Sequence, residues 1–261
     1  VESIQVLKDA ASASIYGAQA ANGVIIITTK RAKKGECHVT FDATLTLQTY
    51  QSGLDMLNAD QWGEVYWAAY KNTYNTTPSS ELYGNGATPK LQPYQNLNGV
   101  TVTPQNTDWE KEIHRTALMQ TYSVGLSKGD ENGTSSMSIS WLDHDGIIRG
   151  SDFQKANTRF SSDYGFLNNR LRAGGNVTIN WWRQHNAPGG AEENAIKMHP
   201  ARTVYDEEGN YNDQVAYGLN DTPNIMRQIS EESNNKHEYW RVFGNAYLSI
   251  KPVKNLIVKT N

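Results

Sequence analysis

Side chains that could carry out catalysis are scattered along this 261-residue chain. The histidines stand far apart, and no two have the spacing that places metal ligands on one helical face: His38, His114, His144, His185, His199 and His237. Residues 206–210 have the composition of a calcium loop without its ligand register, and we predict a β-turn there. The sequence contains no phosphate-binding glycine loop, nucleophile elbow or Cys–His pair. We therefore predict no enzymatic activity and no metal or cofactor.

The densest group of titratable side chains is Asp143-His144-Asp145. Adjacent residues of a strand point to opposite faces of a sheet, so these three side chains would not converge on one ion. We interpret the trio as the tip of a hairpin in water.

Aromatic side chains are better candidates for contact with a ligand. Asn58 can cap a helix in which aromatic and aliphatic residues recur at helical spacing, and Thr107 with Glu110 forms a capping box ahead of a second helix. The aromatic residues of the first helix could stack on sugar rings, although such a stripe more commonly packs onto its own neighbours. Five tyrosines in less regular sequence are our candidates for substrate contact: Tyr83, Tyr94, Tyr205, Tyr211 and Tyr217.

The elements that would hold these residues in place are β-strands. Between residues 39 and 48, apolar and polar residues alternate strictly, which predicts a strand with one apolar and one polar face. About eleven residues are enough for a tilted strand to cross a bilayer. The same alternation recurs near residues 122–126, 137–141, 160–166, 171–181 and 240–250, and a further strand begins at Leu256. The sequence predicts about seven strands.

The connections between the predicted strands alternate in length. Residues 51–118, 143–156 and 184–236 would form long loops, whereas residues 127–133, 167–169 and 251–255 would form short turns. Long loops on one side and short turns on the other are typical of an outer-membrane barrel. Aromatic residues fall at the long-loop ends of the strands and indicate an interfacial girdle: Tyr122, Trp141, Phe160, Trp181, Trp182, Tyr239 and Trp240.

Composition is compatible with such a barrel. The mean hydropathy is -0.65, and no apolar run is long enough for a membrane-spanning helix. The formal net charge of -3 provides no basic surface for nucleic acid. Cys37 is the only cysteine, which excludes a disulfide framework. The chain has neither an initiator methionine nor a signal peptide, so we expect it to be a piece of a longer precursor.

The first thirty residues predict a compact βαβ-like unit. Residues 3–7 favour a strand, Asp9 can cap a helix of small residues, and residues 24–29 form a β-branched run. A run in which every residue is apolar suits a strand covered on both faces, so the unit should lie inside a larger structure.

These residues also carry a family resemblance. The string ESIQVLKDAASASIYGAQAANGVIIITTKR closely resembles the end of the plug domain of the SusC/RagA family of TonB-linked outer-membrane transporters. It departs from the family pattern at scattered positions, such as Gln19-Ala20, where Arg-Gly is usual. Residues 107–120, with the sequence TDWEKEIHRTALMQ, and residues 145–153, with DGIIRGSDF, are similar to later family motifs.

The resemblance implies a fold and a domain division. Residues 1–35 would be the C-terminal part of a plug domain. Residues 36–261 would be the N-terminal part of a transmembrane antiparallel β-barrel, with short helices in long extracellular loops. Seven strands are too few to close such a barrel, because barrels with a plugged lumen have around 22.

The resemblance also implies a function. Members import large nutrients, usually an oligosaccharide and in some cases a peptide, across the outer membrane of bacteria of the Bacteroidetes type. A SusD-like lipoprotein covers the extracellular loops, and the TonB complex acts through an N-terminal part that is missing here.

Two alternatives remain open from the sequence. One is a surface β-sandwich that binds glycans without transporting them, in which the aromatic residues would face a core. The other is a siderophore or cobalamin receptor of the wider TonB-dependent class. The SusC-like sequence of residues 2–30 disfavours this alternative.

Overall fold

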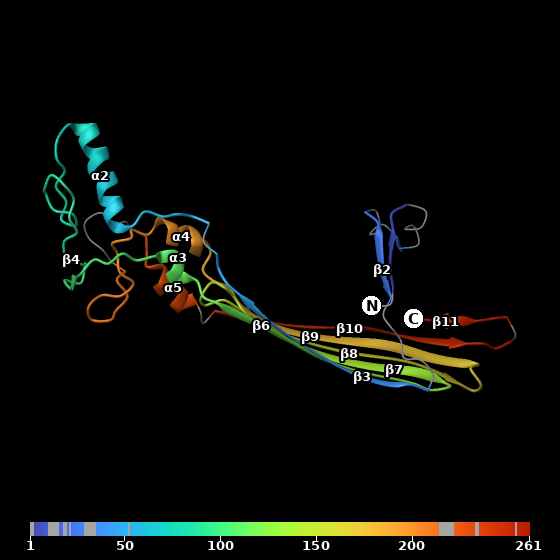
Figure 1. Ribbon diagram of the computed structural model, residues 1–261. Helices are drawn as coiled ribbons and strands as arrows, with labels where there is room; N and C mark the ends of the chain where they lie inside the picture. The colour runs from blue at the N-terminus through green and yellow to red at the C-terminus, as the bar shows by residue number, and fades with distance from the viewer. Residues whose placement is uncertain are drawn as a thin grey trace.

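The computed structural model describes residues 3–9, 16–17, 20, 22–28, 35–51, 53–213, 222–232, 235–253 and 255–261. Its largest element is a seven-stranded antiparallel sheet with the order β11-β10-β9-β8-β7-β6-β3 (Figure 1). The strands are β3 (Cys37–Gln48), β6 (Ala117–Gly129), β7 (Gly133–Asp145), β8 (Asp152–Phe166), β9 (Leu171–His185), β10 (Lys236–Ile250) and β11 (Val258–Thr260). Strands that follow one another along the sheet also follow one another in the sequence, as in an up-and-down barrel wall.

The two faces of the sheet differ in polarity, as the alternation predicts. Directly paired residues lie on the same face of a sheet, and Phe41 is aligned through successive strands with Val124, Ile139, Thr158, Ile179 and Val242. The adjacent row lies on the other face and consists of Asp42, Ser123, Ser140, Asn157, Asn180 and Arg241. The apolar face stays exposed, with Phe41 and Val242 exposed by 68% and 64%.

An aromatic row crosses the apolar face nearer to the large loops. Tyr122, Trp141, Trp181 and Trp240 lie in one register row, and the rings of Trp141 and Trp181 are stacked with centroids 5.7 Å apart. The predicted alignment of the aromatic residues at one level of one face is therefore confirmed for these four residues. It is wrong for the other three. Trp182 and Tyr239 stack on each other on the polar face, and Phe160 lies four residues farther along β8 than the row.

A polar row adjoins the aromatic row on its loop side. On the apolar face, the next positions are Gln120, Asp143, Gln154, Arg183 and Glu238. The aromatic polar atoms point to this row. The Trp181 Nε1–H donates to Glu238 Oε1 at 2.6 Å, and the Tyr122 hydroxyl donates to Gln120 Oε1 at 2.9 Å. Rings with one apolar and one hydrogen-bonded end mark the boundary between hydrocarbon and water.

The apolar band runs obliquely across the register. Leu45 of β3 is apolar at the level where β10 presents Glu238. At the opposite end, β10 continues with Leu248 and Ile250, whereas β3 begins at Cys37, aligned with Ala246. A level band on strands that are tilted relative to the membrane normal produces this offset, because closing a barrel requires tilt and stagger.

The predicted separation of long loops on one side of the sheet from short turns on the other is confirmed only in part. Residues 49–116 and 186–235 separate strands on one side of the sheet, and residues 130–132, 167–170 and 251–257 do so on the other. The predicted long loop 143–156 is wrong, since β7 and β8 continue through most of it and leave only residues 146–151 as the connection. Polar residues do not end a hydrogen-bonded ladder. Asp143, His144 and Asp145 are therefore the last residues of β7 rather than a hairpin tip.

The two large loops fold into an assembly of helices beyond the sheet (Figure 1). The first loop contains α2 (Ala59–Tyr74), β4 (Tyr94–Gln95), β5 (Thr101–Val102) and α3 (Trp109–Ile113), and the second contains α4 (Ala191–Lys197) and α5 (Ile225–Glu232). Asn58 caps α2, as predicted, and its side chain also forms a capping box with Gln61. The predicted Thr107–Glu110 box is wrong, because Asp108 rather than Thr107 caps α3 and accepts from the Lys111 amide. Among the described residues, no helix is both long and apolar enough to cross a bilayer.

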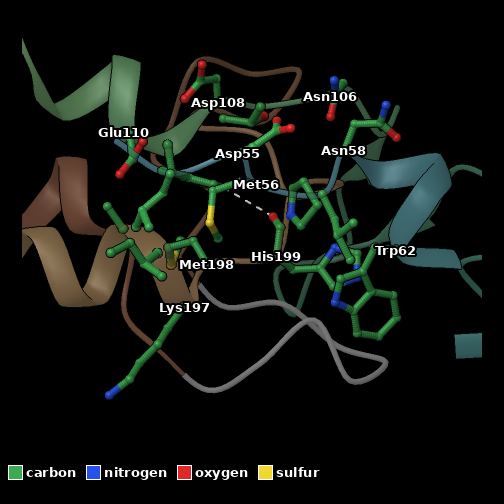
Figure 2. A pocket seen from close by; sticks show the side chains of 17 residues that line it. Asp55, Met56, Asn58, Trp62, Asn106, Asp108, Glu110, Lys197, Met198 and His199 are labelled. Atoms are coloured by element: carbon green, nitrogen blue, oxygen red, sulfur yellow. Dashed lines mark hydrogen bonds between the residues drawn. The ribbon is translucent and has the colours of Figure 1, made fainter. Parts of the chain in front are cut away.

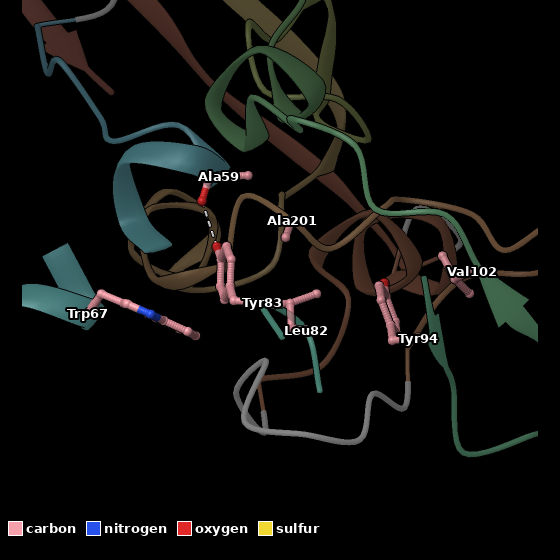
Figure 3. Packing of buried hydrophobic residues seen from close by; sticks show 7 residues of the cluster. All are labelled: Ala59, Trp67, Leu82, Tyr83, Tyr94, Val102 and Ala201. Atoms are coloured by element: carbon pink, nitrogen blue, oxygen red, sulfur yellow. Dashed lines mark hydrogen bonds between the residues drawn. The ribbon is translucent and has the colours of Figure 1, made fainter. Parts of the chain in front are cut away.

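The buried apolar core lies in this loop assembly. One cluster surrounds Trp67, Tyr83 and Tyr94 of the first loop and includes Ala201 of the second (Figure 3). A second cluster joins α3 to α4 and α5, with Ile113 and Ile225 fully buried. Each cluster thus contains residues from both loops, so the two loops form one packed structure.

The described residues near the N-terminus form a hairpin, with β1 (Ser3–Leu7) and β2 (Val24–Thr28) paired antiparallel. The expectation of a βαβ-like unit is wrong in this respect, because a βαβ crossover joins parallel strands. Most of the expected helix lies outside the described residues. Ile4, Val6, Ile25 and Ile27 share one face, on which they are 52–65% exposed. Such a surface is typical of one that packs against other polypeptide.

Candidate functional site: the loop assembly and its cavity

A cavity of about 720 Å³ lies between the two large loops (Figure 2). The segment before α2 contributes one wall, the start of α3 another, and α4 with the residues after it the third. Its lining includes Leu54, Asp55, Met56, Asn58, Trp62, Asn106, Asp108, Trp109, Glu110, Lys197, Met198 and His199. Polar and apolar side chains contribute about equally to this lining, and the volume is in the range of small-molecule sites.

The polar side chains of the lining are held by the surrounding backbone. The Asn58 side chain accepts a hydrogen bond from the Gln61 amide at 2.9 Å, and that of Asn106 accepts one from the Ala59 amide at 3.0 Å. The Tyr50 hydroxyl donates to Glu110 Oε1 at 3.1 Å. In Asn58 and Asn106 the bond uses the side-chain oxygen, and the NH₂ group can still donate. The cavity therefore has fixed walls and a rim that can exchange hydrogen bonds.

His199 is the most unusual polar residue of the lining. Its Nδ1 accepts a hydrogen bond from the Ala201 amide at 3.1 Å, so the neutral ring carries its proton on Nε2. The ring packs edge-on against Trp62, with centroids 4.2 Å apart. Nε2 is buried and has no hydrogen-bond partner among the described residues. Burial disfavours the imidazolium, and it lowers the pKa of His199 to about 4.

This pKa predicts that the loop assembly loosens in mild acid. The unfolded segment binds a proton near pH 6.5, whereas the folded segment does not until about pH 4, so stability falls across this interval as pH falls. The loss approaches about 3 kcal/mol. We expect the protease resistance of the loops to decrease between pH 6.5 and pH 4 in the wild type.

A His199→Phe variant is the matched control, because it keeps a ring beside Trp62 and cannot titrate. Its loop protection should depend less on pH over the same interval. An identical pH profile in the variant and the wild type would contradict the assignment to His199.

The structure places two of the predicted contact tyrosines in the core (Figure 3). Tyr83 is 2% exposed and donates its hydroxyl to the Ala59 carbonyl at 2.6 Å. Tyr94 is 3% exposed, and its hydroxyl accepts a hydrogen bond from Asn212 Nδ2 at 2.8 Å. Burial raises the pKa of both phenols. Tyr94 thus bonds directly to the second loop, whereas Tyr83 bonds within the first loop and belongs to the cluster that includes Ala201 of the second.

Two others lie together at the surface. Tyr205 and Tyr211 flank a turn in which the Asp206 carboxylate accepts hydrogen bonds from the Glu208 and Asn210 amides. The rings are 5.0 Å apart, and Tyr205 is 49% exposed. The β-turn predicted at residues 206–210 is confirmed by the bond from the Gly209 amide to the Asp206 carbonyl. Tyr217 lies outside the described residues.

Sequence reasoning did not identify the cavity. Its walls come from residues 54–62, 106–110 and 195–200, and no local pattern shows that these segments meet. The available signal was the aromatic stripe of α2, whose Trp62 lines the cavity. The sequence favours tyrosines in irregular segments, but Tyr83 and Tyr94 show that such segments can be as well packed as helices.

Known proteins of similar sequence and structure indicate the class to which this chain is related. No family model matches the chain. SusC, a TonB-dependent receptor of Bacteroides thetaiotaomicron, is 29% identical over 222 residues, which cover 84% of this chain and 20% of that protein. TonB-dependent receptor P3 of Formosa agariphila is 25% identical over 257 residues, or 95% of this chain and 23% of the receptor. The chain thus spans about a fifth of the curated relatives that it matches.

Solved structures show the same fold. The structure of the RagAB peptide transporter matches with a TM-score of 0.70 and 23% sequence identity, covering 98% of this chain and 31% of that one. The RagAB peptide importer in the closed-closed state matches with a TM-score of 0.69 and 22% identity, over 98% and 31% of the two chains.

The fold is that of a segment of a transmembrane antiparallel β-barrel, as its exposed apolar band and aromatic row indicate. A β-sandwich would bury such a face under a second sheet, and in the described part of the chain nothing covers it. The matches to SusC and RagAB confirm the resemblance to the SusC/RagA family of TonB-linked transporters. The curated relatives carry names of receptors, and the solved structures carry names of transporters.

Proposed function

We propose that the chain serves in the energised import of a large nutrient, an oligosaccharide or a peptide, across the bacterial outer membrane. The observation that carries the proposal is the combination of two surfaces on one sheet. Its apolar face, with an aromatic row, suits lipid, and its opposite face carries serine, threonine, asparagine and charged side chains that suit a solvated lumen.

The proposed partners are inferred from the proteins that this chain resembles. The curated relatives are named TonB-dependent receptors, and the solved structures are of the RagAB peptide importer. We propose that a SusD-like lipoprotein lies over the loop assembly, and that the TonB complex supplies energy through a segment that these residues do not include. The outer membrane is the proposed location.

Two domains are proposed within the chain. Residues 1–35 would belong to the plug, and residues 36–261 to the barrel wall and its outer loops. The exposed aliphatic face of the β1–β2 hairpin supports the first assignment, because it needs a covering partner. Among the candidate contact tyrosines, Tyr205 and Tyr211 are accessible and are proposed to touch substrate.

Uptake by whole cells tests this function. Cells with and without the full-length gene are given labelled oligosaccharides and peptides, each with and without a proton-gradient uncoupler. We expect uptake of at least one cargo that requires both the gene and the gradient. Binding at the surface without gradient-dependent uptake would overturn the proposal.

A further inference from the structure

Four aromatic side chains form a ladder along α2. Trp62, Tyr66, Tyr70 and Tyr74 stand four residues apart and therefore share one face of the helix. Their ring centroids are separated by 5.6 Å, 6.1 Å and 4.6 Å in succession. Tyr74 is 64% exposed and the other three are half-buried. The ladder is thus a row of neighbouring rings that becomes most exposed at Tyr74.

The ladder stands on a fixed support. Trp62 and Tyr66 pack against the buried cluster around Trp67 and Tyr83. Two further bonds hold the helix to the loop that follows it, from Trp67 Nε1 to the Gly86 carbonyl at 3.0 Å and from Lys71 Nζ to the Ala87 carbonyl at 2.8 Å. A rigid platform loses little conformational entropy when a ligand settles on it.

The ladder leads into the cavity between the loops. Trp62 is the first ring of the ladder and also part of the cavity lining (Figure 2). The helix projects away from the sheet, and Tyr74 lies at its far end (Figure 1). A ligand that lies along the ladder therefore has one end in a cavity with amide and carboxylate side chains and the other end in open solvent.

The chemistry of the two parts favours a sugar chain over a peptide. A pyranose ring has an apolar C–H face that suits an aromatic ring and a rim of hydroxyls that suits amides and carboxylates. An extended peptide is held largely through its main chain by a strand edge. The face of α2 offers no such groups, because the helix uses its own backbone hydrogen bonds.

The charge of the cavity narrows the ligand further. Asp55, Asp108 and Glu110 line it, and the one lysine of the lining, Lys197, is paired with Glu193. A uronate or sulfated sugar would meet carboxylates there, and like charges repel. We infer that the Trp62–Tyr66–Tyr70–Tyr74 ladder and the cavity at its base form one binding track for a neutral linear oligosaccharide. This inference rests on the proposed function and specifies its substrate.

Calorimetry on the purified full-length transporter tests the track. The probes are neutral linear hexasaccharides (malto-, cello-, laminari-, manno- and xylohexaose), the corresponding disaccharides, a hexagalacturonate and a twelve-residue peptide. The variant Tyr70→Ala/Tyr74→Ala should bind the recognised hexasaccharide about tenfold more weakly or worse. Its affinity for the disaccharide should be unchanged, because a disaccharide fills only the cavity.

Two control variants separate stacking from folding. Tyr70→Phe/Tyr74→Phe keeps both rings and should bind within about twofold of the wild type. Val65→Ala changes an exposed residue of the same helix, 55% exposed, and should also bind normally. Equal hexasaccharide affinity in the double alanine variant and the wild type would overturn the inference, as would equal losses in Val65→Ala or binding of only the peptide or the hexagalacturonate.

The uptake assay distinguishes this failure from failure of the proposed function. Gradient-dependent uptake at the wild-type rate by the double alanine variant, with the oligosaccharide well below saturation, overturns the track and leaves the importer intact. Tight binding that depends on the ladder, without gradient-dependent uptake in the wild type, overturns the importer and leaves the track intact.

Discussion

Replacing Val124 with arginine should severely reduce the amount of folded protein in the membrane. Val124 lies on the apolar face of β6, 41% exposed, with Phe41 and Ile139 as its cross-strand neighbours. It lies in the apolar band, two residues from the aromatic row at Tyr122 and four from Lys128. An arginine on the lipid face near the bilayer midplane costs about 2–4 kcal/mol. The measurement is urea unfolding of the full-length protein in lipid vesicles.

The matched control is the same change one residue earlier. Ser123 lies on the polar face and is paired with Asp42, so Ser123→Arg should be tolerated. Thr178 also lies on the polar face but is a poorer control. It is only 5% exposed, so the side chains around it leave no room for an arginine. Comparable losses in the Val124 and Ser123 variants would show that the two faces have been assigned wrongly.

Replacing Arg202 with methionine should disorder the second large loop while the sheet stays intact. Arg202 is completely buried. Its guanidinium donates to the carbonyls of Asn212 at 2.9 Å and Thr222 at 2.6 Å, and to that of Asp213. Burial lowers the pKa of Arg202, and the Asp213 carboxylate opposes that shift. Removing one partner of such a buried network costs about 3–5 kcal/mol.

Hydrogen exchange on peptides from the loop is the appropriate measurement, because global unfolding would report mainly on the barrel. Residues 199–213 and 222–232 should lose protection in Arg202→Met, whereas β8 and β9 should keep theirs. Arg227→Met is the control. Arg227 pairs with the same Asp213, but it is a surface residue and its loss should cost at most about 1 kcal/mol. Unchanged protection in Arg202→Met would show that the guanidinium does not organise the loop.

The barrel wall could be predicted from the sequence because its signal is local. A period of two is set by the pleat of each strand, and lipid imposes it on every strand in turn. The aromatic row was predicted less well for the same reason. Adjacent residues of a strand point to opposite faces of the sheet. Trp181 and Trp182 therefore cannot both belong to one girdle.

The loop assembly could not be predicted because its order comes from contacts distant in sequence. Trp109 Nε1 donates to the His199 carbonyl, and Asn212 Nδ2 to the Tyr94 hydroxyl, across 90 and 118 residues. Nothing in the neighbourhood of Tyr94 indicates that partner. The connection between β7 and β8 is shorter than the sequence predicts for a different reason. Charged residues such as Asp143 and Asp145 indicate a strand end, yet they continue the ladder of β7.

The shared cores of the two large loops have a mechanical consequence. Trp109 and Ile113 of α3 in one loop are packed with α4 and α5 of the other. Along the chain, α3 is followed by β6, α4 follows β9, and α5 is followed by β10. Neither loop can swing outward alone without exposing both cores to water. We therefore expect the outer end of this wall to move as one block, with bending confined to the short segments where the strands leave the sheet.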